Sequence, residues 1–245
     1  MPERKPEVPK TGDLNYVSVD LRDQDSSSFL LAEVRPKAST VENLTKFGRL
    51  TKFKHLKGKP LHKSQHFDNL KNLSKTTPTE SDLIHVNLTR FAVPLGGPGG
   101  KVAVFDMNNC GRIPDGVTPC LVNGTNVLDF AWDPFDDSRL VCGLEDGSIN
   151  VWRIPHNGLE ESSNVPGMSL KSAHSDKVTI VKFNPLASGI VATAGHDLLV
   201  KIRNLSAGNA KEYIVLTGHD DQIYSMAWSL CGKFLATACK DGKVR

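Results

Sequence analysis

The chain has 245 residues, of which 39% are hydrophobic and 23% charged, so it can bury a sizeable core. No apolar run reaches the roughly 18 residues that cross a bilayer, and the charged, proline-containing start is not a secretory signal. Five cysteines without a C-x-x-C pair indicate reduced thiols in the cytoplasm. Neither a transmembrane segment nor secretion is therefore predicted.

The net charge of +3 hides an uneven distribution. Between Lys46 and Lys75, nine basic residues face a single acid, Asp68. Such one-sided charge predicts an acidic partner, and charge alone does not choose between a protein surface, an anionic lipid and a nucleic acid. The segment lacks the aromatic stacking platform of RRM or OB domains, which argues against nucleic acid.

The N-terminal third differs in composition from the rest. Residues 1–45 are polar, so we expect a linker or tail with little fixed structure. Residues 46–82, here called the basic segment, carry scattered apolar residues that favour short helical or irregular pieces. From residue 83 onward, short runs rich in Val, Ile and Phe alternate with turn residues, which is typical of an all-β fold.

The first strands are predicted at residues 84–88, 91–94 and 102–106. The last two flank a glycine-rich turn at residues 96–100. This turn is not a phosphate-binding P-loop, because Leu95 and Val102 stand where that motif needs glycine and Ser/Thr. We therefore predict a β-hairpin.

Three later segments align as internal repeats, beginning at Val127, Val178 and Ile223. Each alternates apolar and polar residues and has an aromatic residue near its end. Second strands are predicted at 139–144, 190–194 and 234–239, and third strands at 148–153 and 199–204. The repeat offsets of 51 and 45 residues approach the roughly 40–45 residues of a WD40 propeller blade.

Specific motifs carry a family resemblance. Gly218 and His219 resemble the Gly-His pair of WD40 repeats, and residues 151–153 resemble the WD dipeptide region. Residues 51–55, 145–159, 223–229 and 237–241 are similar to coronin signatures in order and spacing. Over residues 47–245 the chain therefore resembles the coronin family, and in particular the second propeller of its long, tandem-propeller branch.

This resemblance implies a WD40 β-propeller of which about half the blades are present. The implied domains are a tail over 1–45 and a partial propeller over 46–245. Within the propeller we expect the basic segment (46–82), a first blade (83–122) and repeats at 123–170, 171–216 and 217–245, the last incomplete at the C-terminus.

The resemblance also implies a structural network in the blades. In WD40 repeats the histidine bonds the turn aspartate and a strand hydroxyl, which satisfies buried polar groups. We accordingly expect His174 to pair with Asp197 and Thr193, and His219 with Asp241 and Thr237. In the first of the three repeats, Asp146 and Trp152 occupy the matching positions.

No catalytic or metal-binding constellation is visible. His62 and His66 are four residues apart, but Lys63 stands where the H-E-x-x-H zinc motif needs glutamate. The acidic group around Asp136 lacks the spacing of a calcium loop. We expect neither an enzyme nor a bound metal or cofactor.

Filamentous actin is the partner that the resemblance implies. The matching basic position is Lys71, with Lys240 at a second family position. Charge alone adds Lys52, Lys54, Lys57 and Lys59 as further candidates. Lysine at position 71, where the family more often has arginine, keeps the charge without the bidentate guanidinium.

Two functions remain open. The first is a cytoplasmic, cytoskeleton-associated scaffold that binds actin filaments. The second, implied by the long branch, is a trafficking adaptor at Golgi or endosomal membranes that binds proteins instead of filaments.

Overall fold

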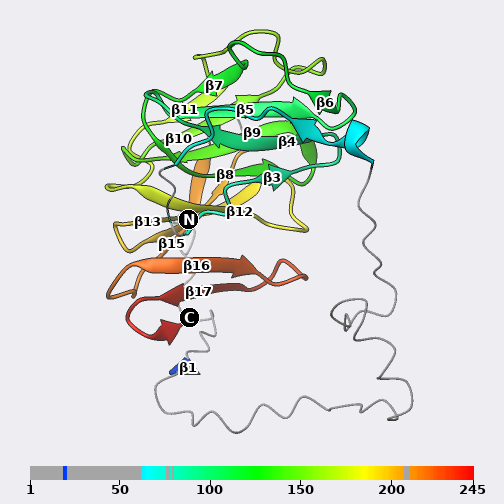
Figure 1. Ribbon diagram of the computed structural model, residues 1–245. Coiled ribbons are helices and arrows are strands. Elements are labelled where there is room, and N and C mark those ends of the chain that lie inside the picture. Colours follow the sequence, from blue (N-terminus) through cyan, green and yellow to red (C-terminus); the bar gives the residue numbers. More distant parts are fainter. Residues whose placement is uncertain (1–18, 21–61, 76–77, 79, 207–209) are drawn as a thin grey trace, which may run out of the picture.

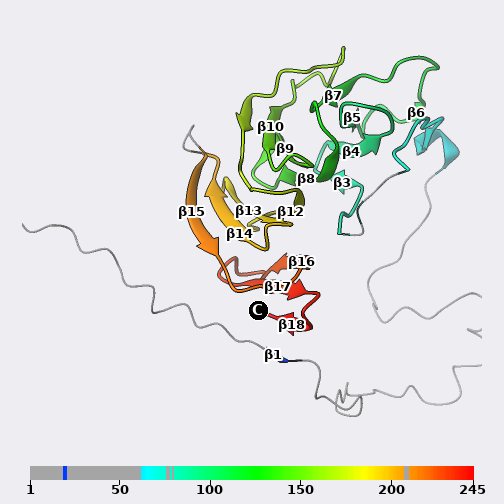
Figure 2. The ribbon, with the colours of Figure 1, turned by 90° about the vertical axis from the view of Figure 1, so that its left-hand side faces the viewer.

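Strands dominate the computed structural model, which describes residues 19–20, 62–75, 78, 80–206 and 210–245 (Figure 1). In these residues, four antiparallel sheets of four strands each are stacked face to face. Seen from the side, the stack curves as the blades of a propeller do (Figure 2). The expected all-β propeller fold is thus confirmed. No helix within the described ranges has the length and apolarity to cross a membrane.

The sheets follow one another along the chain. The first contains β3 (His85–Val86), β4 (Arg90–Leu95), β5 (Lys101–Asp106) and β7 (Cys120–Val122). The second contains β8 (Val127–Asp133), β9 (Asp136–Leu144), β10 (Ile149–Arg153) and β11 (Met168–Leu170). The third contains β12 (Val178–Phe183), β13 (Ile190–Gly195), β14 (Val200–Asn204) and β15 (Lys211–Leu216). The fourth contains β16 (Ile223–Trp228), β17 (Leu235–Cys239), β18 (Lys243–Val244) and β1 (Val19–Asp20).

Every strand predicted from residue 84 onward is present within a few residues of its expected bounds. The outer strands β7, β11 and β15 were not predicted. β11 is short and its residues are at most half-buried, so its sequence lacks a clear apolar alternation. A turn of 3-10 helix, η3 (Lys63–Gln65), and the short parallel pair β2 (Phe67–Asp68) and β6 (Gly111–Arg112) complete the elements.

The core consists of apolar layers between neighbouring sheets. Phe130, Trp132 and Trp152 belong to the layer between the first and second sheets. Val141, Val178 and Val191 lie in the next layer, and Ile180, Ile223 and Met226 lie between the third and fourth sheets. β9 is buried almost throughout because neighbours cover both of its faces.

Among the described residues, the fourth sheet is covered on one face only. Along β16, Ile223 and Met226 are buried, whereas Tyr224 and Ala227 are exposed. Only two of the six residues of β16 are buried, in contrast to six of the nine residues of β9.

Residues 80–85, here called the hub segment, connect the inner strands of several sheets. Ser81 Oγ donates to Asp129 Oδ1 on β8 at 3.0 Å. Asp82 pairs with Lys182 on β12, and Glu80 accepts from Gln222, which precedes β16. Because adjacent residues bind three different sheets, this short stretch fixes their relative positions.

Asp129 is the most deeply buried acid at this junction. Its second oxygen, Oδ2, accepts the backbone N–H of Val181 at 2.7 Å. Burial raises the pKa of Asp129 to about 7, against the opposing effects of the Val181 and Ser81 hydrogen bonds and the charge of Lys182. The native state therefore holds a proton here that the unfolded chain releases near pH 4.

We predict that Asp129 makes the fold less stable as pH rises. Between about pH 4 and pH 7 the native state binds more protons than the unfolded state, so stability falls by at most about 1.4 kcal/mol per pH unit. Asp129→Asn should remove this slope, because the amide oxygen can still accept from Val181. Urea unfolding of the 245-residue chain at pH 5.5 and pH 8 measures the effect. Asp176→Asn, at an exposed acid, should keep the wild-type slope, and an unchanged slope in Asp129→Asn would contradict the prediction.

The turn between β9 and β10 fits closely against the loop before β12. Gly147 has a φ of +79°, and its carbonyl accepts the N–H of His174 at 2.9 Å. A Cβ at this position would lie 2.5 Å from the carbonyl oxygen of His174. Both the backbone conformation and the available space therefore require glycine here.

Gly147→Ala should destabilise the chain by more than the roughly 1 kcal/mol of a left-handed alanine alone. Gly158→Ala is the matched control, since Gly158 has a similar φ of +85° with open space around its Cβ position. Thermal unfolding of both variants separates the clash from the backbone strain. Equal losses of stability in the two variants would show that the second and third sheets do not meet as closely as described.

Candidate binding surface

The described part of the basic segment is anchored on the outer face of the first sheet. Phe67 on β2 packs edge-on against Phe91, with ring centroids 4.7 Å apart, and Phe91 stacks on Phe105 at 5.1 Å. Leu70 joins the same apolar cluster. The aromatic packing leaves the polar residues that follow Phe67 at the surface.

Lys71 lies on this surface and is paired. Its Nζ lies 2.5 Å from Asp115 Oδ1, and the side chains of the two residues are 62% and 61% exposed. Asn69 and Arg112 also donate to Asp115, at 3.0 and 3.4 Å. Hydrogen bonds from Lys71, Asn69 and Arg112 lower the pKa of Asp115. Because these groups are exposed, solvent screens the pair and another acidic group can replace Asp115.

The other candidate lysines are not gathered around Lys71. Lys240 lies in the turn between β17 and β18, with its Nζ 3.9 Å from Asp221. The first and fourth sheets stand at opposite ends of the stack, so Lys71 and Lys240 do not form one patch (Figure 1). Lys52, Lys54, Lys57 and Lys59 lie outside the described residues.

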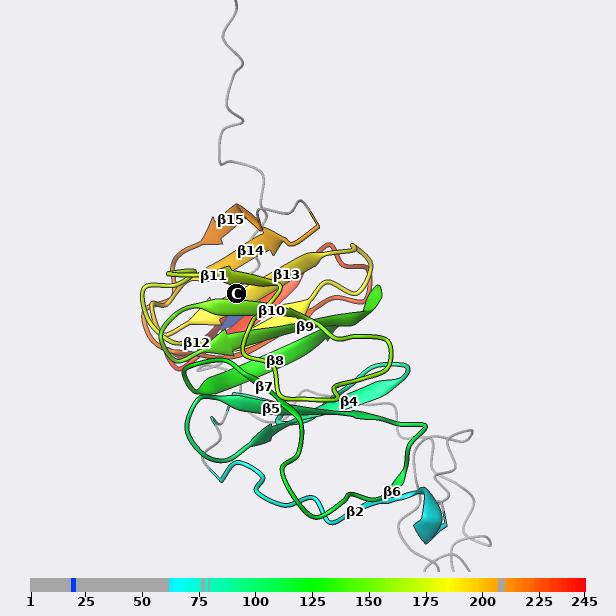
Figure 3. The ribbon, with the colours of Figure 1, turned by 90° about the horizontal axis from the view of Figure 1, so that it is seen from above.

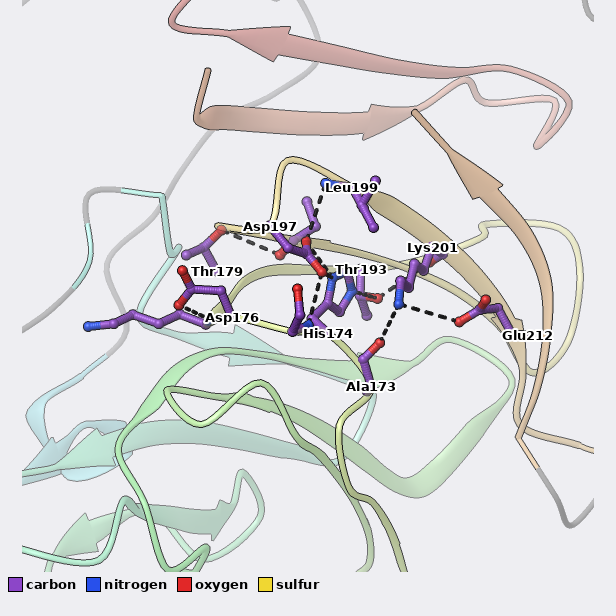
Figure 4. Close-up of polar contacts among 12 residues, drawn as sticks. Ala173, His174, Asp176, Thr179, Thr193, Asp197, Leu199, Lys201 and Glu212 are labelled. Carbon is purple, nitrogen blue, oxygen red and sulfur yellow. Dashed lines mark hydrogen bonds and ion pairs between the residues drawn. The ribbon is translucent and has the colours of Figure 1, made fainter. Parts of the chain in front are cut away.

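The structure brings His174, Thr193 and Asp197 together in the third sheet (Figure 4). His174 Nδ1 lies 2.9 and 3.0 Å from the two Asp197 oxygens, and Nε2 lies 2.9 Å from Thr193 Oγ1. Burial lowers the pKa of His174, so the ring is neutral near pH 7. A carboxylate only accepts, so Nδ1–H donates to Asp197 and Nε2 accepts from Thr193.

Two cations complete this network: Arg203, at the position that Trp152 occupies in the preceding repeat, and Lys201, two residues before it. Lys201 Nζ and Arg203 Nη2 both donate to the carbonyl oxygen of Ala173, at 2.9 and 2.8 Å. Glu212 on β15 balances their charge, 2.6 Å from Arg203. The loop that carries His174 is thus fixed through its main chain as well as its side chain.

The equivalent network in the fourth sheet differs from the expected one. His219 Nε2 lies 2.8 Å from Thr237 Oγ1, as expected. The direct hydrogen bond expected between His219 and Asp241 is replaced by Arg245, whose Nη1 lies 2.9 Å from His219 Nδ1 and 2.8 Å from Asp241 Oδ2. Since the guanidinium only donates, His219 accepts at Nδ1 and carries its proton on Nε2, the opposite tautomer to His174.

One group of side chains in the described chain has its potential ligand atoms close enough together for a metal ion, within 4.8 Å of one another. The group consists of His219, Cys239 and Asp241. The guanidinium of Arg245 contacts both His219 and Asp241 and already supplies a positive charge. It would repel a metal cation, and Cys239 Sγ donates to the carbonyl of Asp221. The arrangement is that of a structural ion pair.

In the second sheet, Asp146 and Trp152, which were expected in the structural network, have separate partners. Asp146 accepts from Ser148 within its own turn. Trp152 Nε1 donates to Asn123 Oδ1 at 2.8 Å, and Asn150 donates to the same oxygen at 3.1 Å. Asn123 stands four residues before Val127, as His174 does before Val178, and this shared spacing was the signal that could have identified it.

Two family descriptions match parts of the chain. "Domain of unknown function (DUF1899)" matches residues 46–112, which include the basic segment from its start and most of the first sheet. "WD domain, G-beta repeat" matches residues 210–245. The WD40 domain of Toxoplasma gondii coronin is similar in structure, with a TM-score of 0.62 at 24% identity, over 69% of this chain and 43% of that one. This likeness supports the fold.

Similar proteins of known name are coronins. Human Coronin-7 is 47% identical over 198 residues, which is 81% of this chain and 21% of that protein. The Saccharomyces cerevisiae coronin-like protein is 31% identical over 82% of this chain and 31% of its own length. Human Coronin-2A is 30% identical over 80% and 38%. The chain thus spans about a fifth to two fifths of these relatives. Its sequence and its stacked sheets place it in the coronin family of WD40 propeller proteins.

Proposed function

We propose that the chain is part of a non-enzymatic scaffold that binds actin filaments through the surface around Lys71. The observation that carries this proposal is the exposed basic pair formed by Lys71 and Arg112, the latter 71% exposed, on a segment anchored by Phe67. A rigid β-scaffold that presents cations suits recognition of an acidic protein surface. We place this activity in the cytoplasm, in association with the cytoskeleton.

Asp115 acts in this proposal as an internal competitor. It engages Lys71, Arg112 and Asn69 together, so a filament must displace it before both cations are available. Solvent and salt screen exposed ion pairs, so displacing Asp115 costs little free energy. The affinity for actin should therefore respond to Asp115 in the opposite direction to Lys71.

A second function has one specific observation in its favour. The chain is 47% identical to human Coronin-7, against 30% to human Coronin-2A. This difference supports the long branch of the family and with it a trafficking adaptor at Golgi or endosomal membranes. In that role the propeller binds cytoskeletal or trafficking proteins, and filament binding is not needed.

We predict that Lys71→Glu weakens co-sedimentation of the 245-residue chain with filamentous actin about tenfold, while Asp115→Asn strengthens it severalfold. Both effects should diminish at high salt, which screens exposed charges. Lys171→Glu makes the same charge change in the loop between the second and third sheets and should have little effect. Lys240→Glu tests whether the fourth sheet contributes.

Two results would contradict the actin proposal. Equal losses in Lys71→Glu and Lys171→Glu would indicate unspecific charge attraction. If the chain stays in the supernatant at low salt even as Asp115→Asn, this surface does not bind filaments, and the adaptor function becomes the one to pursue.

A further inference from the structure

Each of the four sheets exposes a large apolar side chain at the same turn. The turns that join the first two strands of the sheets carry Leu88, Phe135, Leu186 and Leu230, which are 84%, 49%, 64% and 93% exposed. Phe234 is a second exposed residue in the last turn. Since equivalent turns of stacked sheets share one face of a propeller, these five residues form a row, here called the turn arc.

The turn arc is held rigidly. Asn87 Nδ2 in the first turn donates to the carbonyl oxygen of Asp137 beside the second, at 2.9 Å. Asn184 Nδ2 in the third turn donates to the carbonyl oxygen of Gly232 in the fourth, at 2.8 Å. These side-chain bonds link the first turn to the second and the third turn to the fourth, so the apolar tips within each pair keep fixed relative positions.

The opposite face has a different character. Among the described residues, no large apolar side chain is exposed in the turns and loops of this face. The turns are residues 145–148, 196–199 and 240–242, and the loops are residues 171–177 and 217–222. They carry ion pairs instead, such as Lys177 with Glu145 and Lys243 with Asp220. Exposed apolar groups concentrated on one face mark an interaction surface.

A cavity of about 320 Å³ lies beside the first two turns of the arc. Thr89, Asp106, Asp137 and His156 line it, and neither aspartate has an ion-pair partner among the described residues. The cavity can therefore receive a partner's cation between two carboxylates.

Arg90 also lines this cavity and is 6% exposed. Its Nη atoms donate to the main-chain carbonyls of Asp137, Pro155 and His156. Its Nε is buried without a partner in the described structure. The buried guanidinium is thus part of the cavity wall, and its charge offsets one of the two carboxylates.

We propose that the turn arc docks a basic amphipathic segment of a partner protein. Its apolar side chains cover Leu88, Phe135, Leu186 and Leu230, and one Lys or Arg enters the cavity between Asp106 and Asp137. Charge complementarity selects this partner: Asp106 and Asp137 outweigh the single cation of Arg90 in the cavity, and the resulting negative charge disfavours an acidic segment and an anionic membrane surface. Asp106 also lines a second cavity together with Arg112 and Asp115, so this site adjoins the surface around Lys71.

The test uses a fluorescent 18-residue helical peptide of leucine and lysine and the 245-residue chain, with binding followed by anisotropy. A peptide with glutamate in place of each lysine is the matched probe. The leucine–lysine peptide should bind and the leucine–glutamate peptide should not. Leu88→Ser with Phe135→Ser should weaken binding at least tenfold. Asp106→Asn with Asp137→Asn should weaken it severalfold and reduce its salt dependence.

Val215→Ser on β15 is the control, because it removes an exposed apolar residue away from the turns. The changed side chains are exposed or at the cavity edge, and circular dichroism of each variant verifies folding. Equal binding of both peptides, or equal losses in Val215→Ser and the arc variants, would overturn the proposal. So would vesicle binding or self-association of the chain that disappears in Leu88→Ser with Phe135→Ser, since the occupant would then be lipid or a second copy.

Discussion

Burial of apolar side chains between neighbouring sheets is the constraint on which the rest of this structure depends. A sheet such as β8–β11 has two apolar faces and becomes stable only when another sheet lies on each side. The curved stack satisfies this demand by repetition (Figure 3). The first and fourth sheets are covered differently from the two sheets between them. The basic segment covers the first sheet through Phe67 and Leu70, whereas the fourth sheet keeps Tyr224 and Ala227 exposed.

Stacking of the sheets also excludes water from polar groups at the ends of the strands. These groups then need hydrogen-bond partners within the protein. Three of the four sheets meet this demand with different residues at equivalent positions. Asn123 with Trp152, His174 with Asp197, and His219 with Arg245 all fix the loop before the first strand to the later strands of the same sheet. The surface proposed for binding, around Lys71 and Asp115, lies outside these networks and is free to change its partners.

The inner strands could be predicted because their period-two alternation is strong and aromatic residues end each run. The outer strands β7, β11 and β15 could not, since they gain their order from pairing with an inner neighbour and show little pattern of their own. Among the candidate residues, His174 and Thr193 follow from the repeat spacing and the family resemblance. Arg245 could not be foreseen, because its role depends on the strand register that places it opposite Thr237. The pairing of Lys71 with Asp115, 44 residues away, likewise requires the tertiary structure.

The network around His174 closes within one repeat, whereas the apolar layers and a separate set of hydrogen bonds, such as the one from Val181 to Asp129, join one repeat to the next. His174, Thr193, Asp197, Lys201, Arg203 and Glu212 all come from the stretch that builds the third sheet. Duplication or loss of one such stretch during evolution would leave this internal network intact. The new boundary would have to match in apolar shape, which tolerates substitution readily, and to rebuild the hydrogen bonds between repeats, such as the one from Val181 to Asp129. The hydrogen-bond network inside a blade thus allows that blade to be gained by duplication and to diverge in sequence.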